Sequence, residues 1–185
     1  MKKPIIAIVL AALILFGTAF ALKSVAADNA RDHHLQLMKT LLPGSESFTA
    51  EAYFGEDANI VSVHKAENGF VIETVTRGYA DEIRMLIGVN LDGKVTGLVV
   101  AEAHETVGLG NNVLNDHGFL AQFLNKSGSF AVATVGEDAF SGATGDTQTE
   151  TEVYVDAITG ATVTSKAIAR CVNSAAAYVT GADAV

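Results

Sequence analysis

An uncharged apolar run near the N-terminus constrains this chain more than any other feature. Residues 4–22 contain no charged side chain, and lysines flank the run at positions 2, 3 and 23. A helix of this length spans about 28 Å, close to the thickness of the hydrocarbon layer of a membrane. The run therefore predicts a single transmembrane helix. The paired lysines before it predict a cytoplasmic N-terminus and an extracytoplasmic remainder.

A cleaved signal peptide is the alternative interpretation of the same run. Ala19-Phe20-Ala21 has the small-x-small form of a signal peptidase site. The apolar core of a signal peptide is typically about 7–15 residues long, which is shorter than this run and favours a retained anchor. We therefore expect a transmembrane anchor over residues 1–24, a linker with a short helix over 25–48 and one folded domain over 49–185.

Charge and cysteine content narrow the possible functions. The chain has 12 basic and 21 acidic residues, for a net charge of −9, and the part beyond Lys23 carries nine basic residues against all 21 acids. Because such an acidic domain repels the phosphates of nucleic acid, no nucleic-acid partner is expected. A single cysteine, Cys171, excludes an internal disulfide and a cysteine-ligated iron–sulfur cluster. A redox function would require an organic cofactor.

The middle of the chain has the pattern of an antiparallel sheet. Turn residues separate four β-branched or alternating runs, at 60–64, 70–75, 83–91 and 95–103. Asp92-Gly93 supplies a residue able to adopt positive φ, so the last two strands should pair directly. Short helices are expected over 29–42 and 119–124. Together these patterns predict an α+β fold with an antiparallel sheet and flanking helices.

The segment after these strands interrupts their pattern. It reads His104-Glu105-Thr106-Val107-Gly108-Leu109-Gly110. Its glycines allow the backbone to approach a ligand closely, and Glu105 and Thr106 provide polar groups at the same edge. A binding loop and an ordinary strand-to-helix connection explain the glycines equally well. The zinc motif H-E-x-x-H begins at His104 but fails, because Gly108 stands where it needs its second histidine. The adjacent pair His33-His34 is better explained as a solvated helix face, because neighbouring residues on a helix point about 100° apart. No metal site is expected.

The C-terminal part of the chain contains one short motif twice. Residues 138–144 and 156–162 both fit D-x-x-[ST]-G-A-T and end at Thr144 and Thr162. Small neighbours leave a threonine hydroxyl accessible to a modifying enzyme or a bulky substrate. The first copy leads into a polar loop. The second follows a predicted strand at 153–155 and leads through Thr164-Ser165 into a helix whose apolar face carries Ile168, Cys171, Val172, Ala175 and Val179.

Thr162 stands just before this predicted helix. Unpaired N–H groups and a partial positive charge at a helix N-terminus would stabilise a phosphate attached there. A purely structural interpretation is also open, in which G-A-T-x-T-S forms a tight turn and Thr164 or Ser165 caps the helix.

Two of these motifs resemble signatures of the FMN-binding domain family. Gly160-Ala161-Thr162-Val163-Thr164-Ser165, with Asp156 upstream, resembles its flavinylation motif, and residues 105–110 look like its E-T-P-G-L-G signature with valine in place of proline. The motifs occur in the expected order. With the single N-terminal span, the whole chain resembles the G subunits of Rnf electron-transport complexes, which are related to the C subunits of sodium-pumping NADH:quinone reductases.

The resemblance implies a covalent phosphoester between FMN and the Thr162 hydroxyl, formed by a separate flavin transferase. Thr162 is then an attachment point, and no residue is expected to be catalytic. The transferase would read the motif around it, and a second group would lie against the flavin ring. The motif group is Asp156, Thr159, Gly160, Ala161, Thr164 and Ser165, and the ring group is Glu105, Thr106, Gly108, Leu109 and Gly110.

The resemblance also implies a place in a membrane complex. The chain would carry electrons between membrane subunits during ferredoxin:NAD oxidoreduction coupled to sodium or proton translocation, without being catalytic alone. Its partners would be the other subunits, the flavin transferase during maturation and the lipid bilayer of the cell membrane. The alternative is an anchored extracytoplasmic module that binds FMN or another ligand for regulation, outside such a complex.

Overall fold

The computed structural model describes residues 31–105, 110–133 and 152–181. The expected anchor, the ring-group residues Thr106, Gly108 and Leu109, and the motif ending at Thr144 lie outside these ranges. Within them, no helix combines the length and apolar character needed to cross a membrane. The chain divides into two compact units, Met1–Leu37 and Met38–Val185. Residues 31–41 are helical, which agrees with the helix expected over 29–42.

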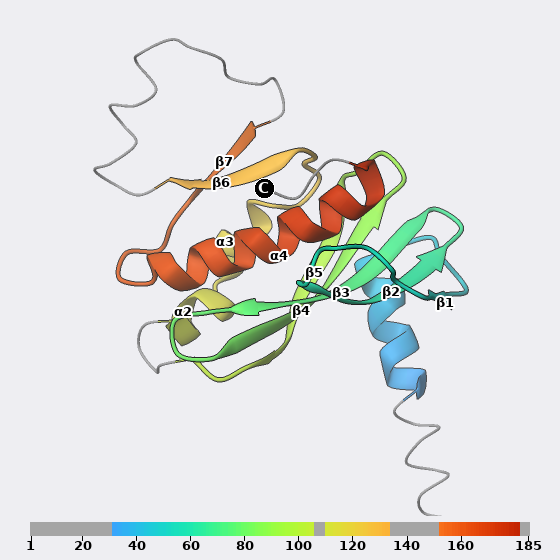
Figure 1. The fold of residues 1–185 in the computed structure, drawn as a ribbon, viewed down its shortest axis with the longest axis horizontal. Helices are drawn as coiled ribbons and strands as arrows, with labels where there is room; N and C mark the ends of the chain where they lie inside the picture. Colours follow the sequence, from blue (N-terminus) through green and yellow to red (C-terminus); the bar gives the residue numbers. More distant parts are fainter. Residues whose placement is uncertain (1–30, 106–109, 134–151, 182–185) are drawn as a thin grey trace, which may run out of the picture. The chain divides into compact units, whose positions relative to one another are not determined.

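A five-stranded antiparallel sheet forms the centre of the second unit (Figure 1). Its strands follow one another in chain order, and each pairs with the next. They are β1 (Thr49–Glu51), β2 (Ile60–Ala66), β3 (Gly69–Arg77), β4 (Glu82–Asn90) and β5 (Val95–Ala103). The four strands predicted from the sequence are confirmed as β2 to β5. The three-residue strand β1 had no pattern long enough to be predicted.

The direct pairing of β4 with β5 is confirmed, and the turn between them explains it. Gly93 adopts φ +76°, as the Asp92-Gly93 pair required. Asn90 closes the turn, because its side-chain oxygen accepts the N–H groups of Asp92 at 3.1 Å and Lys94 at 2.8 Å. Local turn chemistry therefore sets the register of this hairpin.

A second, two-stranded sheet was not anticipated. The strands β6 (Ser129–Ala133) and β7 (Glu152–Asp156) pair in parallel, with Phe130 opposite Val153. Asn173 holds β6 to the last helix, since its side chain accepts the N–H of Phe130 at 2.7 Å and donates to the carbonyl of Phe130 at 3.0 Å. The parallel pair brings the start of the second D-x-x-[ST]-G-A-T motif next to a strand more than 20 residues earlier.

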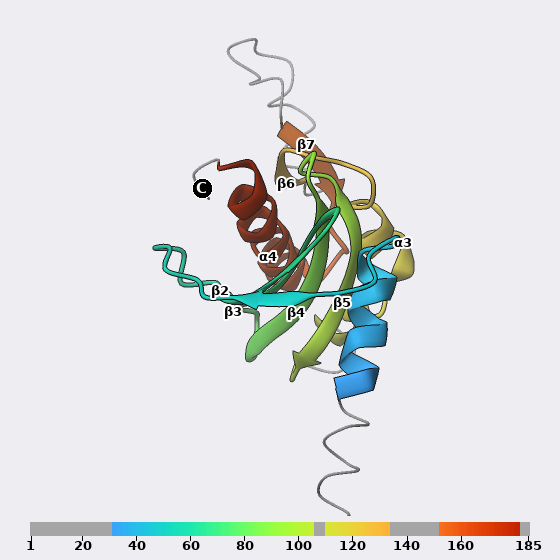
Figure 2. The same cartoon turned by 90° about the vertical axis from the view of Figure 1, so that its right-hand side faces the viewer.

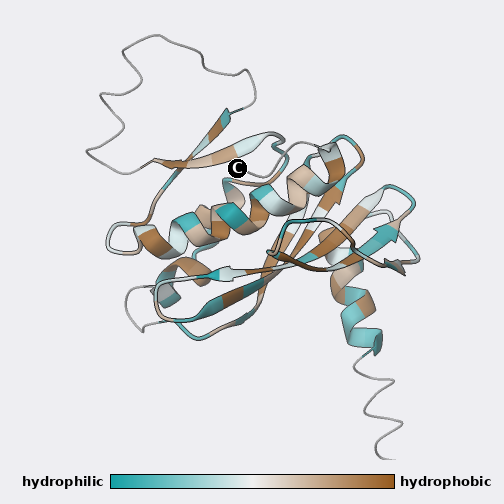
Figure 3. Ribbon diagram, in the orientation of Figure 1, coloured by the Kyte–Doolittle hydropathy of each residue, from teal (hydrophilic) through white to brown (hydrophobic). Residues whose placement is uncertain are grey.

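The long helix α4 (Thr162–Thr180) lies across one face of the five-stranded sheet (Figures 1 and 2). The expected apolar face is confirmed, since Ile168, Cys171, Val172 and Ala175 are buried. Figure 3 shows brown apolar residues on both the sheet and this helix. The short helices α2 (Gly110–Leu114) and α3 (His117–Ala121) complete the described part of the unit. Within and just after α3, Phe119 and Phe123 are buried with their rings edge to face.

The expected start of α4 is wrong, and so is the alternative interpretation in which Thr164 or Ser165 caps the helix. The helix begins at Thr162 itself and not after Thr164-Ser165, and its N-cap residue is Ala161, which makes no side-chain cap hydrogen bond. Thr164 and Ser165 therefore lie inside the first turn, and neither caps the helix. The physical reason is that both hydroxyls are engaged elsewhere, Thr164 with Glu105 and Ser165 with the carbonyl of Ala161.

Candidate functional site

An open cleft lies at the N-terminal end of α4. It has a volume of about 240 Å³, and its lining comes from three separate parts of the chain, namely Tyr79, Gly110 and the run from Gly160 to Thr164. Pockets that enclose a drug-sized ligand usually measure about 300–1,000 Å³. This cleft therefore suits one end of such a ligand and leaves the remainder outside.

The first turn of α4 offers donors to an anion in this cleft. Thr162 is half-buried at the first helical position, and Gly160 before it adopts φ +80° in the turn that leads into the helix. Because Ala161 has no side-chain oxygen, it cannot accept the N–H groups of the residues after it, as a serine or aspartate cap would. A phosphate at Thr162 could accept these N–H groups, and the partial positive charge of a 19-residue helix would favour it.

Ser165 fixes the loop that precedes the helix. This buried side chain donates to the carbonyl of Ala161 at 3.0 Å and accepts the N–H of Ile158 at 3.4 Å. The N–H of Ala161 is in turn donated to the carbonyl of Ile158 at 3.0 Å. These bonds tie residues 158–161 to the first turn of α4, so the backbone around Thr162 is held in one conformation.

The carboxylate of Glu105 lies in a slot between two glycines. One oxygen accepts the Thr164 hydroxyl at 3.2 Å, and the other accepts the N–H of Ala80 at 3.3 Å. A Cβ on Gly78 would stand 2.1 Å from one carboxylate oxygen, and a Cβ on Gly110 would stand 2.2 Å from the other. The glycines thus make room for Glu105, which joins the loop between β3 and β4 to the first turn of α4.

Asp156 and Thr159 lie outside the cleft lining. Asp156 ends β7 and is exposed, and its backbone N–H and carbonyl bond to the side chain of Gln122, at 2.7 Å and 3.3 Å. Thr159 is exposed in the loop before α4. Both are accessible from solvent, as residues read by a modifying enzyme would be.

The structure brings the two sequence motifs together. Gly110 from the first motif shares the cleft with residues of the second, and Glu105 contacts Thr164 across 59 positions of sequence. Sequence reasoning missed Tyr79, which lines the same cleft. The available signal was an aromatic residue directly after a glycine, in a turn between two strands.

Cys171 takes no part in this site. It is fully buried on α4, and burial raises the pKa of its thiol to about 11. The thiol therefore stays protonated at neutral pH and behaves as a small packed side chain, as expected from the sequence.

Comparison with known proteins assigns the family. The sequence model described as the FMN-binding domain matches residues 78–177, which is more than half of the chain and includes every residue of the cleft. The chain belongs to the FMN-binding domain family. The α+β fold with its antiparallel sheet is consistent with this assignment, and FMN is the cofactor that the family name specifies.

Several relatives of this FMN-binding domain chain are named as the G subunits of complexes. The chain is 37% identical over 109 residues to the G subunit of the Na(+)-translocating ferredoxin:NAD(+) oxidoreductase complex of Acetobacterium woodii, covering 57% of this chain and 46% of that protein. It is 30% identical over 158 residues to the G subunit of the ion-translocating oxidoreductase complex of Haemophilus influenzae, covering 74% of each. The chain spans about half the length of the first of these curated relatives.

One solved structure is also similar. The crystal structure of Shewanella oneidensis NqrC aligns with a TM-score of 0.47 at 20% sequence identity, covering 73% of this chain and 64% of NqrC.

Proposed function

We propose that this chain is an electron-carrying flavoprotein subunit that holds FMN covalently through a phosphoester to Thr162. The observation that carries the proposal is the position of Thr162, at the first residue of a 19-residue helix without a side-chain cap and in the lining of a cleft. A threonine there combines a hydroxyl for the ester with backbone donors for the phosphate oxygens. Bound FMN would accept and release the electrons.

The residues around Thr162 have separate roles in this proposal. Ser165 holds the backbone of the loop, and Glu105 acts as a positioning residue that joins the loop after β3 to the first turn of α4. Gly160 and Ala161 keep the cleft open because they carry little or no side chain. Gly110 leaves room for the carboxylate of Glu105. Asp156 and Thr159 remain on the surface for recognition by the flavin transferase. Thr106, Gly108 and Leu109 would contact the flavin ring, as the family resemblance implies.

The proposed setting is an Rnf-type membrane complex. The relatives that match this chain at 29–37% identity are G subunits of complexes named for ion translocation, and two of those names specify ferredoxin:NAD(+) oxidoreduction. We infer that residues 1–24 anchor the chain in the cell membrane and that the domain over 49–185 carries FMN on the extracytoplasmic side. The chain would pass electrons between membrane subunits and would not be catalytic alone.

The test is covalent flavin incorporation. The full chain is co-expressed with a flavin transferase, and its intact mass is measured under denaturing conditions for the wild type, Thr162→Ala and Thr144→Ala. We expect the wild type and Thr144→Ala to gain the mass of FMN minus one water, and Thr162→Ala to gain nothing.

The control uses the duplicated motif of the same chain. Loss of the mass increment in Thr144→Ala, with retention in Thr162→Ala, would move the attachment to the first copy. An unmodified wild type in the presence of an active transferase would contradict covalent attachment and favour a module that binds its ligand reversibly.

A further inference from the structure

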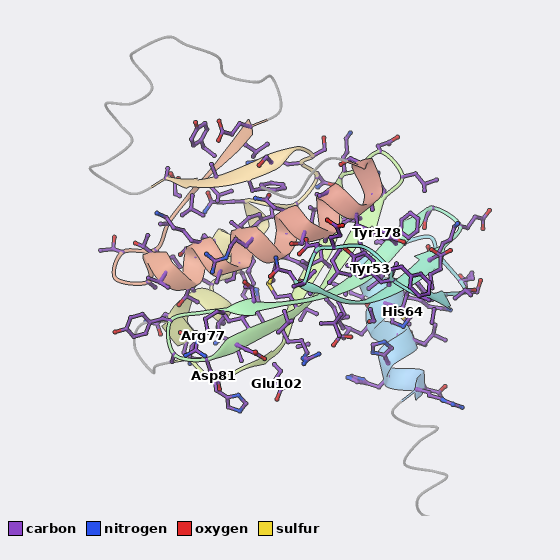
Figure 4. All side chains as sticks on the ribbon, viewed as in Figure 1. Tyr53, His64, Arg77, Asp81, Glu102 and Tyr178 are labelled. Carbon is purple, nitrogen blue, oxygen red and sulfur yellow. The ribbon has the colours of Figure 1, made fainter. Side chains whose placement is uncertain are left out.

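Tyr79 is an exposed aromatic residue on a loop that is otherwise fixed. Its side chain is 61% exposed, at the turn between β3 and β4. The turn is closed by a bond from the N–H of Gly78 to the carbonyl of Asp81 at 2.8 Å. The side chain of Arg77 reaches over the same turn to the carbonyl of Ala80 at 3.2 Å. Figure 4 labels Arg77 and Asp81, which flank the turn on either side.

The backbone on both sides of Tyr79 is also held by the elements that form the cleft. Arg170 of α4 donates to the carbonyl of Arg77 at 2.9 Å, and Glu105 accepts the N–H of Ala80 at 3.3 Å. The backbone at Tyr79 is therefore held in a fixed position relative to α4. Because the backbone is already held, only the side-chain torsions of Tyr79 remain to be ordered when a ligand binds, which reduces the entropic cost of binding.

The ring itself is not used within the described part of the chain. Tyr79 makes no side-chain hydrogen bond, ion pair or ring contact with the residues that the structure describes. It is nevertheless the aromatic member of the cleft lining, which it shares with Thr162 and with Val163, itself 49% exposed. An aromatic face next to an anion site is suited to a ligand that has a planar ring at one end and a phosphate at the other.

We propose that Tyr79 is the stacking partner of the flavin ring, so that its phenol ring covers one face of the isoalloxazine of FMN held at Thr162. This inference rests on the proposed function above and adds a positioning residue outside both sequence motifs. The cleft is too small to enclose a whole cofactor, and a rim aromatic extends its apolar wall toward solvent. Stacking on Tyr79 would fix the orientation of the isoalloxazine ring. The opposite edge of the isoalloxazine would stay open to a redox partner.

Flavin fluorescence tests this proposal, because a phenol ring in contact with an excited flavin quenches it by a reversible, light-driven electron transfer within the pair. A phenyl ring can stack in the same place but is a poor electron donor. The full chain is co-expressed with a flavin transferase as wild type, Tyr79→Phe, Tyr79→Ala and the control Tyr154→Ala. Tyr154 is a second exposed tyrosine, at 52%, on β7 and outside the cleft lining. The fluorescence of each protein is divided by its flavinylated fraction from intact mass.

We expect a quenched wild type, a several-fold brighter Tyr79→Phe and Tyr79→Ala, and no change in Tyr154→Ala. Collisional quenching by iodide should rise in Tyr79→Ala and stay near the wild-type value in Tyr79→Phe, because only the alanine uncovers the ring face. If Tyr79→Ala fails to fold or to acquire flavin, Tyr79→Phe alone decides the question.

Two results would overturn the proposal. Unchanged fluorescence in a flavinylated Tyr79→Phe would mean that the phenol does not touch the flavin, and an equal gain in Tyr154→Ala would mean that the effect is not specific to the cleft. Absence of flavin from the wild type would instead count against the proposed function, and the mass measurement separates that case.

Discussion

Replacing Gly110 by alanine probes the slot that holds Glu105. The new Cβ would stand 2.2 Å from one carboxylate oxygen of Glu105 and 2.8 Å from the hydroxyl of Thr164. A carboxylate at the end of a flexible side chain can usually move aside at little cost. Here the carboxylate accepts hydrogen bonds from Ala80 and Thr164, and moving it breaks or lengthens both.

The expected magnitude follows from these contacts. A hydrogen bond to a charged group contributes about 1.5–3 kcal/mol, and the half-buried position and long distances at Glu105 favour the lower end, so that losing both costs about 3 kcal/mol. Against this, alanine in place of glycine stabilises a helix by about 1 kcal/mol. We expect Gly110→Ala to lower the free energy of unfolding by about 2 kcal/mol, which corresponds to a drop in Tm of about 4–8 °C for a chain of this size.

Thermal and urea unfolding of the full chain, purified without flavin, measures this change in single and double variants. In a Glu105→Ala background the carboxylate is absent. Gly110→Ala should therefore not lower the free energy of unfolding in that background and should show only the stabilisation from helix propensity. The expected coupling energy between the two positions is about 3 kcal/mol. The control is Gly118→Ala in α3, where a Cβ would meet only Asp116 at 3.1 Å, so this change should cost no stability and should show at most the helix-propensity gain of about 1 kcal/mol. An equal cost of Gly110→Ala in both backgrounds would refute the role assigned to Glu105.

Two further outcomes are expected. The Cys171 thiol has a pKa of about 11 in the folded chain and about 9 in the unfolded chain. The free energy of unfolding should therefore be unaffected by this thiol below about pH 9 and should fall by roughly 3 kcal/mol between about pH 9 and pH 11. Urea unfolding measured across that pH range should show that the free energy of unfolding falls more steeply with pH for the wild type than for Cys171→Ala. Parallel pH dependences of the two proteins would rule out the buried thiol as the cause. Ser165→Ala should lower the free energy of unfolding by about 1–2 kcal/mol, because it removes the bonds to Ile158 and Ala161. The exposed neighbour Lys166→Ala should leave stability within about 0.5 kcal/mol, and an equal loss at both positions would contradict the specific role of Ser165.

The candidate site could be predicted in part, because both of its motifs are short and contiguous. Thr162, Gly160 and Gly110 were singled out from the sequence, and all three line the cleft. The role of Glu105 could not be predicted, since its partners, Ala80 and Thr164, are 25 and 59 positions away. Tyr79 was missed for the same reason. No local pattern indicates that the turn after β3 meets the start of α4.

Elements with local signals could be predicted from the amino-acid order alone. Alternating β-branched residues predicted β2 to β5, Asp92-Gly93 predicted their last hairpin, and the apolar spacing of Ile168, Cys171 and Ala175 predicted α4. Three features emerged only from the folded chain: the parallel pairing of β6 with β7, the first residue of α4 and the assembly of the cleft. These features depend on contacts between residues far apart in the chain, such as Asn173 with Phe130 and Glu105 with Thr164. Turn chemistry and periodicity act over a few residues, whereas the energy of such contacts exists only once the chain has brought distant segments together.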